Sequence, residues 1–249
     1  YHARNFLDRN EALNEVSQNL KSIEAKQVIQ DAMKDSFYVI RAKAINSLNP
    51  MSINEAVEKN IYAIAKSDPS YLVREEAINV IGALNKEKYK NDFINWSKDS
   101  SYTIAGAALE ALDAIDSVTA YQLAQAASKA PIKKRLNTVV TKLLTKYGDE
   151  SEFDFIANKY ESLNNQSEEK FQMTQPFAAL LMKTKNADKF KRGIEIIVAF
   201  RESIPAQYRT QTDPYFNAKV LGEILKVKKQ NGENELVKVV TAVLPMLIK

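Results

Sequence analysis

The sequence contains no cysteine among its 249 residues, few glycines and prolines (6 and 7), and a single histidine, His2. Without cysteine the chain has no disulfide bonds and no thiolate metal ligands, and its cellular compartment stays undetermined. With one histidine it can form neither a His-Glu-x-x-His zinc motif nor a Ser-His-Asp triad away from its first residues. We therefore expect no catalytic residues, no metal ligands and no cofactor in this chain.

Long hydrophobic runs are also missing. The longest, such as residues 194–200, are broken by charge well short of the roughly 20 apolar residues that span a bilayer. We expect no membrane segment.

The chain begins Tyr-His-Ala-Arg, without an initiator methionine or a signal-peptide pattern. We interpret it as a piece of a longer protein, and either a cytoplasmic or an exported location stays open.

Charge is distributed unevenly along the chain. Residues 1–116 carry 14 Lys/Arg and 17 Asp/Glu, a net of −3, whereas residues 117–249 carry 21 and 14, a net of +7. The densest basic clusters, in residues 133–135 and 183–192, alternate with acidic positions. A DNA enzyme with a basic groove would present such clusters to phosphates. The acidic first half argues against it, and we expect solvated surface charge and no nucleic-acid partner.

Three stretches of the first half resemble one another: DSFYVIRAKAINSLN (residues 35–49), DPSYLVREEAINVIGAL (68–84) and DSSYTIAGAALEALD (99–113). Their alignment superposes Asp35, Asp68 and Asp99, then Tyr38, Tyr71 and Tyr102, then Ala44, Ala77 and Ala108. A helical repeat of 30 to 45 residues is typical of an α-solenoid. Asp68 followed by Pro69 predicts an N-cap and first turn, and we expect the tyrosines to be half-buried packing residues.

Beyond the repeats the pattern is less regular but remains helical. We expect helices over residues 132–147, 151–163, 171–185 (kinked or split at Pro176), 188–203, 213–229 and 233–249, with an irregular connector over 204–212. No stretch alternates like a strand. The sequence therefore predicts an all-α superhelix of antiparallel helix pairs in a single domain, residues 1–249. Its regular repeats cover about 1–130, less regular helices cover 131–249, and a soft boundary lies near 164–170.

The spacing of Asp35 to Arg41 and of Asp68 to Arg74, six residues in each pair, resembles the HEAT-repeat signature. In HEAT repeats such residues form a ladder of polar contacts between successive turns, so the resemblance implies this role for these four residues. Ala105 replaces the arginine after Asp99, and we expect the ladder to stop there. Arg9 is placed to continue it at the front.

A second resemblance involves the two ends of the chain. ARNFLDRNEAL (residues 3–13) and IPAQYRTQTDPYFNAKVLGEIL (residues 204–225) are similar to the C-terminal helical domain of bacterial zinc aminopeptidases, the aminopeptidase N and leukotriene hydrolase family. The resemblance implies a zinc-containing catalytic domain upstream. It also implies that Arg201 or Arg209, beside the connector with Tyr208 and Tyr215, faces a catalytic cleft or a partner. A structural role, holding the connector in place, is the one we favour for these side chains.

Two functions of different class follow. The favoured one is a non-catalytic C-terminal helical domain that packs on its own catalytic domain, restricts access to the cleft and borders the peptide substrate. The alternative is a HEAT-type adaptor that binds another protein. Substrate preference and oligomeric state do not follow from the sequence.

Overall fold

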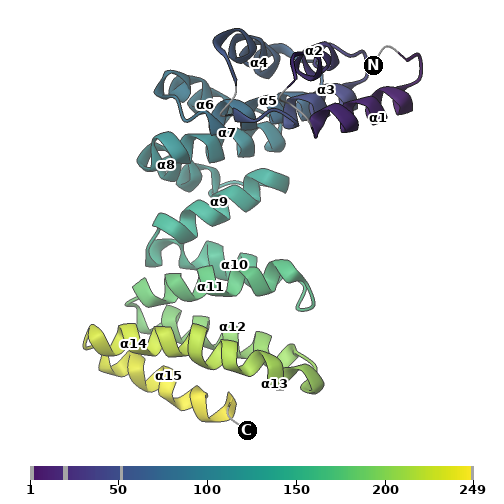
Figure 1. The fold of residues 1–249 in the computed structure, drawn as a ribbon. Coiled ribbons are helices and arrows are strands. Elements are labelled where there is room, and N and C mark those ends of the chain that lie inside the picture. Colours follow the sequence, from purple (N-terminus) through teal and green to yellow (C-terminus); the bar gives the residue numbers. More distant parts are fainter. Residues whose placement is uncertain (1–2, 19–21, 51–52, 248–249) are drawn as a thin grey trace. The chain divides into compact units, whose positions relative to one another are not determined.

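The computed structural model describes residues 3–18, 22–50 and 53–247, and every regular element among them is a helix (Figure 1). The prediction of an all-α chain is therefore confirmed. Scarce glycine and proline, and apolar residues recurring every three or four positions, give this result because both favour amphipathic helices over strands.

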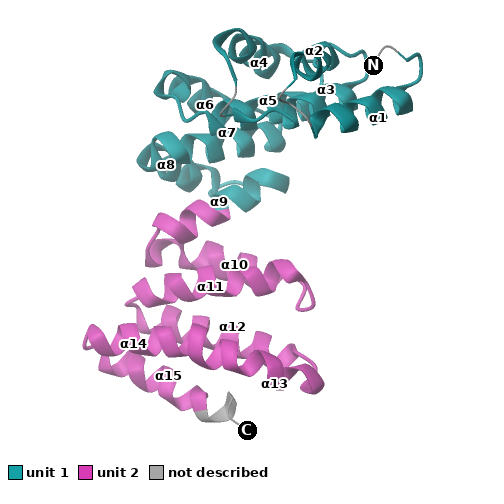
Figure 2. Ribbon diagram, in the orientation of Figure 1, with its two compact units in different colours: residues 1–140 teal, residues 141–249 magenta. Residues whose placement is uncertain are grey.

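Contacts within the chain divide it into two compact units, residues 1–140 and 141–249 (Figure 2). The division falls inside one helix, α9 (Lys134–Tyr147). Residues 164–170, where we expected a soft boundary, include the turn between two helices of the second unit and do not separate compact parts.

Unit 1 is built from two layers of helices. Its elements are α1 (Phe6–Ser17), α2 (Ile23–Ala32), α3 (Tyr38–Asn46), α4 (Glu55–Ser67), α5 (Tyr71–Ala83), η2 (Glu87–Tyr89), α6 (Lys90–Trp96), α7 (Tyr102–Ile115) and α8 (Ser117–Ala127). Helices α1, α3, α5 and α7 pack successively on one another, while α2, α4 and α6 pack on α3, α5 and α7 (Figure 1). Each sequence repeat thus contributes one helix to the continuous layer.

Small residues let the helices of this continuous layer approach closely. Ala44, Ala77 and Ala108, the aligned alanines of the three repeats, are all completely buried. A Cβ atom placed on Gly82 of α5 would lie only 2.6 Å from the Cβ of Ala111 in α7. Larger side chains at these positions would force the helix axes apart.

The start of α5 differs from our expectation. Ser70, and not Asp68, is the N-cap residue, and α5 begins at Tyr71. The carboxylate of Asp68 instead accepts the backbone N–H of Ser70 at 2.8 Å, which closes a tight turn between α4 and α5. The same Asx turn precedes α3 and α7, at Asp35 and Asp99.

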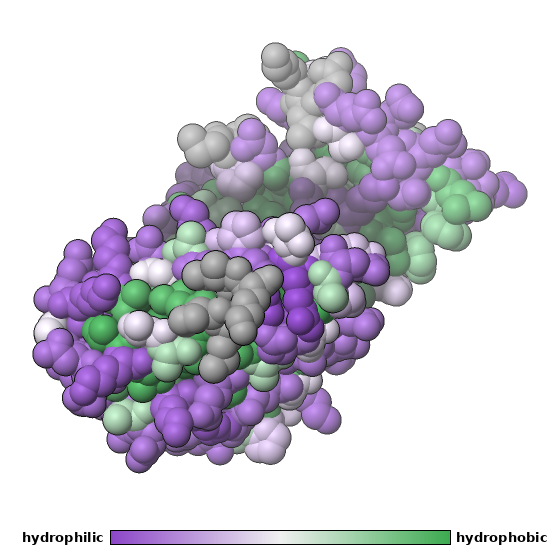
Figure 3. All heavy atoms as spheres, turned by 90° about the horizontal axis from the view of Figure 1, so that it is seen from below, coloured by the Kyte–Doolittle hydropathy of each residue, from purple (hydrophilic) through white to green (hydrophobic). Residues whose placement is uncertain are grey.

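Unit 2 contains the remaining helices. They are η3 (Glu150–Glu152), α10 (Phe153–Ser162), α11 (Glu168–Lys183), α12 (Ala187–Ser203), α13 (Ala206–Pro214), the π-helical segment η4 (Tyr215–Gly222), α14 (Glu223–Gln230) and α15 (Asn234–Leu247). Helix α11 packs on α10, α12 and α14, and α15 packs on α12 and α14. Seen from below, the nearer face shows hydrophobic side chains surrounded by hydrophilic ones (Figure 3).

Two of the prolines of unit 2, Pro176 and Pro214, do not act on their helices as we expected. Helix α11 runs through Pro176 without interruption, because Met173, Phe177 and Leu181 are buried on both sides of it and their burial outweighs one lost hydrogen bond. The expected connector is helical as α13, and Pro214 ends α13 instead of opening a helix. Because proline cannot donate to the carbonyl four residues earlier, the chain continues as a π-helical turn.

Candidate functional site

Arginine–aspartate pairs join the successive helices of the continuous layer in unit 1. The guanidinium of Arg41 binds the carboxylate of Asp68 through two bonds of 2.8 Å. Arg9 binds Asp35 in the same way, at 2.7 and 3.1 Å. The structure thus brings together one arginine of each turn with the aspartate that precedes the next helix.

The last pair of this ladder is weaker. Arg74 reaches Asp99 only at 3.5 Å, and its Nε atom is buried without a hydrogen-bond partner. Both side chains are also more exposed than those of Arg41 and Asp68. At Ala105 the next arginine is missing, so Asp99 ends the series.

The arginines of the two closer pairs are also bound to backbone carbonyls before their own helices. Arg41 donates to the carbonyl oxygens of Asp35 and Ser36, at 2.8 and 3.2 Å, in addition to its bonds with Asp68. Arg9 makes equivalent bonds to two carbonyls that precede α1. Together with the arginine–aspartate pairs, these contacts hold the N-terminal ends of α1, α3, α5 and α7 side by side. The ladder side chains therefore have a structural role.

The helix ends aligned in this way carry a row of aromatic side chains. Phe6, Tyr38, Tyr71 and Tyr102 are the first residues of α1, α3, α5 and α7, and we call this row the tyrosine edge. Phe6, Tyr38 and Tyr71 are 45%, 41% and 43% exposed, while Tyr102 is half-buried. Large apolar side chains exposed in a row, and not singly, are typical of an interaction surface.

Positive charge accompanies the tyrosine edge. Exposed lysines precede the first residues of α3, α5 and α7 by four or five positions: Lys34, Lys66 (in the last turn of α4) and Lys98. None of the three has a carboxylate within ion-pair distance in the described part of the chain. The aspartates before the same helices are neutralised by the ladder arginines. Although the first half of the sequence is acidic overall, each tyrosine of the edge therefore follows an unpaired lysine closely in the chain.

The predicted cleft-facing arginines of unit 2 are used internally. Arg201 is only 5% exposed, and it holds the carboxylate of Asp213 through two bonds of 2.8 and 2.7 Å. Arg209 donates to the carbonyl oxygens of Ile204 and Glu202 at 2.8 and 2.6 Å. Both guanidinium groups therefore fix the turn between α12 and α13, and buried Arg201 does not face outward.

The two tyrosines predicted beside them have different environments. Tyr208 is 51% exposed on α13 and is free to meet a partner. Tyr215 stacks on Phe171 with ring centroids 4.8 Å apart, and burial raises the pKa of its phenol. Of the four residues we singled out here, Tyr208 has the environment of an interaction residue.

The basic clusters noted in the sequence are largely compensated by nearby acceptors. Arg135 binds Glu75 at 2.6 Å and Glu110 at 2.9 Å. Arg192 binds Glu161 at 2.6 Å. Lys183 donates to two backbone carbonyls at the end of α9. These clusters do not form an open groove of free cations.

Two buried lysines of unit 2 were not foreseen. Lys228 is 0% exposed, lies 2.6 Å from Glu233, and donates to the carbonyls of Met182 and Thr184 that end α11. Lys170 is 5% exposed in the first turn of α11. Each lysine lies four residues from a buried side chain of its helix, on the same face as the apolar residues. This spacing could have predicted from the sequence that the two lysines are buried.

A buried carboxylate of unit 1 was also missed. Glu58 on α4 is 3% exposed and accepts hydrogen bonds from Lys86, from Lys88 at 2.8 Å and from the hydroxyl of Tyr89 at 2.6 Å. These bonds, that of Lys86 first, lower the pKa of Glu58 to about 2. Burial and the bond to Glu58 raise the pKa of Tyr89 to about 12.

In residues 3–18, 22–50 and 53–247, no group of three or more acidic or histidine side chains converges to hold a metal ion. No helix in these ranges combines the length and apolarity needed to cross a bilayer. His2 lies outside the described residues. No family model, no curated protein and no solved structure matches the chain.

Proposed function

We propose that this chain is a non-catalytic helical scaffold domain that holds a second protein domain through the tyrosine edge of unit 1. The observation that carries the proposal is the edge itself: Phe6, Tyr38 and Tyr71 are exposed at the starts of successive helices, and an unpaired lysine precedes each tyrosine by four or five residues. Exposed aromatic residues are the usual anchors of protein interfaces. The ladder supports this role because it fixes the spacing of the rings before any partner binds, which reduces the entropy lost on binding.

The partner we propose is a zinc aminopeptidase catalytic domain in the same polypeptide, upstream of this chain. Support comes from the resemblance of residues 3–13 and 204–225 to the helical domain of that family. In this role the chain packs on the catalytic domain, limits access to its cleft and borders the peptide substrate. The zinc belongs to the upstream domain.

The coding sequence upstream of Tyr1 provides the first test. We expect a His-Glu-x-x-His motif with a further glutamate downstream of it. If a complete upstream sequence contains no such motif, the aminopeptidase proposal is wrong. The alternative, a HEAT-type adaptor for a separate protein, then takes its place, since the same tyrosine edge supports it.

A binding measurement tests the edge directly. With the upstream segment produced separately, we expect it to co-elute with the chain. Replacing both Tyr38 and Tyr71 by serine should weaken binding by about 1,000-fold, since losing each aromatic anchor costs about 2 kcal/mol. Ile23→Ser and Val118→Ser are matched controls, because these side chains are 81% and 66% exposed away from the edge. Equal effects of both pairs would refute the assignment of the edge.

A purified chain also tests the non-catalytic part of the proposal. We expect no hydrolysis of amino-acid anilides with added zinc, and chelator-sensitive turnover by this chain alone would overturn the non-catalytic assignment.

Lysines beside aromatic rings also occur in proteins that bind single-stranded nucleic acid. Steeply salt-dependent binding of a single-stranded oligonucleotide, lost in the tyrosine double variant, would replace the protein partner by a nucleic acid.

A further inference from the structure

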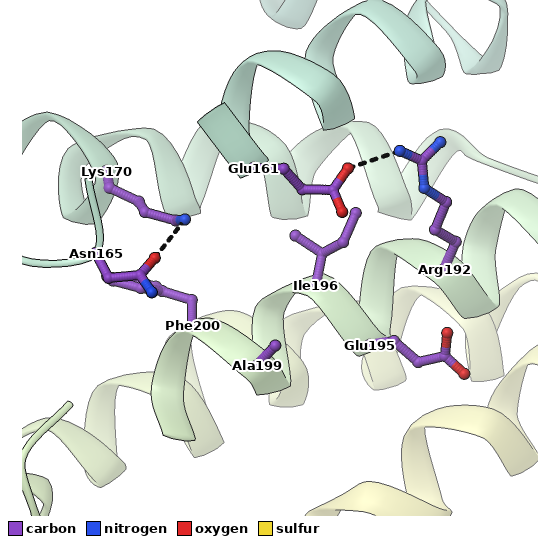
Figure 4. A pocket seen from close by; sticks show the side chains of 8 residues that line it. All are labelled: Glu161, Asn165, Lys170, Arg192, Glu195, Ile196, Ala199 and Phe200. Carbon is purple, nitrogen blue, oxygen red and sulfur yellow. Dashed lines mark hydrogen bonds and ion pairs between the residues drawn. The ribbon is translucent and has the colours of Figure 1, made fainter. Parts of the chain in front are cut away.

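Unit 2 contains a surface pocket that the proposed function does not use. Its volume is about 430 Å³, and it lies among α10, α12 and the start of α11 (Figure 4). The lining side chains are Glu161, Asn165, Lys170, Arg192, Glu195, Ile196, Ala199 and Phe200. Figure 4 shows Lys170 and Asn165 at one end, Arg192 and Glu195 at the other, and the apolar side chains between them.

Lys170 is a buried cation without a carboxylate partner. Its side chain is nearly enclosed, and no carboxylate of the described chain lies within ion-pair distance of Nζ. Its ammonium donates to the carbonyl of Leu163 at 3.2 Å and to Oδ1 of Asn165 at 2.6 Å. The rings of Tyr160 and Phe200 lie 5.1 and 5.5 Å away. Loss of hydration lowers the pKa of Lys170, and the negative charge of Glu161 opposes this only in part.

These contacts leave Lys170 short of one interaction. An ammonium has three N–H donors, and two have protein acceptors. A buried charge is costly unless an opposite charge compensates it. The Oδ1 atom of Asn165 is used by Lys170, so its amide NH₂ is available to donate to the same anion.

The rest of the pocket favours an organic ligand over an inorganic ion. Glu161 binds Arg192 at 2.6 Å, and its carboxylate does not lie within ion-pair distance of Lys170. Ile196, Ala199 and Phe200 provide an apolar floor between the charged ends. The volume greatly exceeds what a single small ion fills, and apolar walls with a few placed polar groups are typical of small-molecule sites.

We propose that this pocket binds a small organic carboxylate, whose carboxylate lies against Lys170 and the amide of Asn165 and whose apolar body lies along Ile196, Ala199 and Phe200. Binding would supply the counter-charge that Lys170 lacks. This site is independent of the tyrosine edge, which belongs to unit 1.

Titration of the 249-residue chain with hexanoate tests the proposal, with hexanamide as the uncharged probe of the same shape. Because the probe is small, we expect a Kd on the order of 1 mM for hexanoate and at least a tenfold preference over hexanamide. Lys170→Met should abolish that preference. Lys191→Met is the matched control, an exposed lysine of α12 outside the pocket lining, and should leave it unchanged.

A measurement on the unmodified chain covers the case in which the Lys170 variant fails to fold. The ε-¹³C resonance of Lys170, followed against pH, should titrate at higher pH with hexanoate bound than without it, because a bound carboxylate favours the ammonium. Equal binding of hexanoate and hexanamide, no binding of either, or an unchanged titration of Lys170 would each overturn the proposal.

Discussion

The ladder of unit 1 makes a quantitative prediction about the pair Arg41 and Asp68. Arg41→Met keeps much of the side-chain volume while removing the guanidinium. Asp68→Asn keeps an oxygen that can accept the N–H of Ser70, so the turn before α5 is preserved. The two single variants and the double variant form a cycle that isolates the energy of the pair.

Its magnitude follows from burial and geometry. Arg41 and Asp68 are 13% and 7% exposed and share two bonds of 2.8 Å, so screening by water is limited. We expect a coupling energy of about 2 kcal/mol for such a bidentate pair. Arg41→Met alone should cost about 3 kcal/mol, because it also leaves the carbonyls of Asp35 and Ser36 without a donor.

The chain offers an internal control. Arg74 and Asp99 occupy the same repeat positions but lie 3.5 Å apart and are 27% and 23% exposed. Their cycle should give no more than about 0.5 kcal/mol, as for exposed ion pairs. Equal couplings in the two cycles, or a stronger one at Arg74, would refute the argument from burial.

Urea unfolding followed by fluorescence measures both cycles. Trp96 is the single tryptophan of the sequence, and it lies in α6 of unit 1, with its ring centroid 5.9 Å from that of Phe93 and 6.2 Å from that of Tyr62. Its emission therefore reports on the unit that contains the ladder. This matters because two compact units need not unfold in one transition.

Three further perturbations have expected outcomes. Because the pKa of Glu58 is lowered from 4.5 to about 2, chiefly by the hydrogen bond from Lys86, its stabilisation is complete above pH 4.5 and is lost as the pH falls toward 2. At pH 7 the free energy of unfolding of Glu58→Gln should therefore be about 1–2 kcal/mol below that of the wild type, a value reduced because the lysine partners of Glu58 are exposed. Near pH 2 the variant and the wild type should be equally stable. A difference that does not change with pH would contradict this. Lys228→Met should cost about 3 kcal/mol in chemical unfolding, because it removes the cation paired with Glu233 and the donor to the carbonyls at the end of α11. A loss below about 1 kcal/mol would show the pair to be dispensable. Gly106→Val should lower the melting temperature sharply, because a Cβ there would lie 2.8 Å from the backbone nitrogen of Leu136, and an unchanged melting temperature would show that the backbone can move aside.

Recurrence in the sequence was enough to find helices α3, α5 and α7 of unit 1 and their shared positions. Asp35, Asp68 and Asp99 all lie in the turns before the helices of one layer. The aligned tyrosines all begin those helices. These features are local, and each repeat packs on the next in a similar way, so a periodic sequence reports a periodic structure.

Prolines were the least reliable guides to helix ends. Pro176 lies inside α11, and Pro214 lies inside a helical run that extends from α13 through η4 to α14. A single proline costs about 3 kcal/mol in a helix, whereas burial of each large apolar side chain stabilises by about 1.5–3 kcal/mol. Whether the helix continues through a proline depends on how many of its apolar side chains are buried against other helices. The local sequence does not contain that information.

By itself, the sequence determined the helical class, the repeat of unit 1 and the residues of its arginine–aspartate ladder. Only the tertiary structure decided which charged side chains are free. It placed Arg201 in an internal ion pair, joined Arg135 to Glu75 across 60 positions, and buried Lys170 beside a pocket. Helical periodicity follows from local geometry, but the partner of a long charged side chain depends on which distant helix packs against its own.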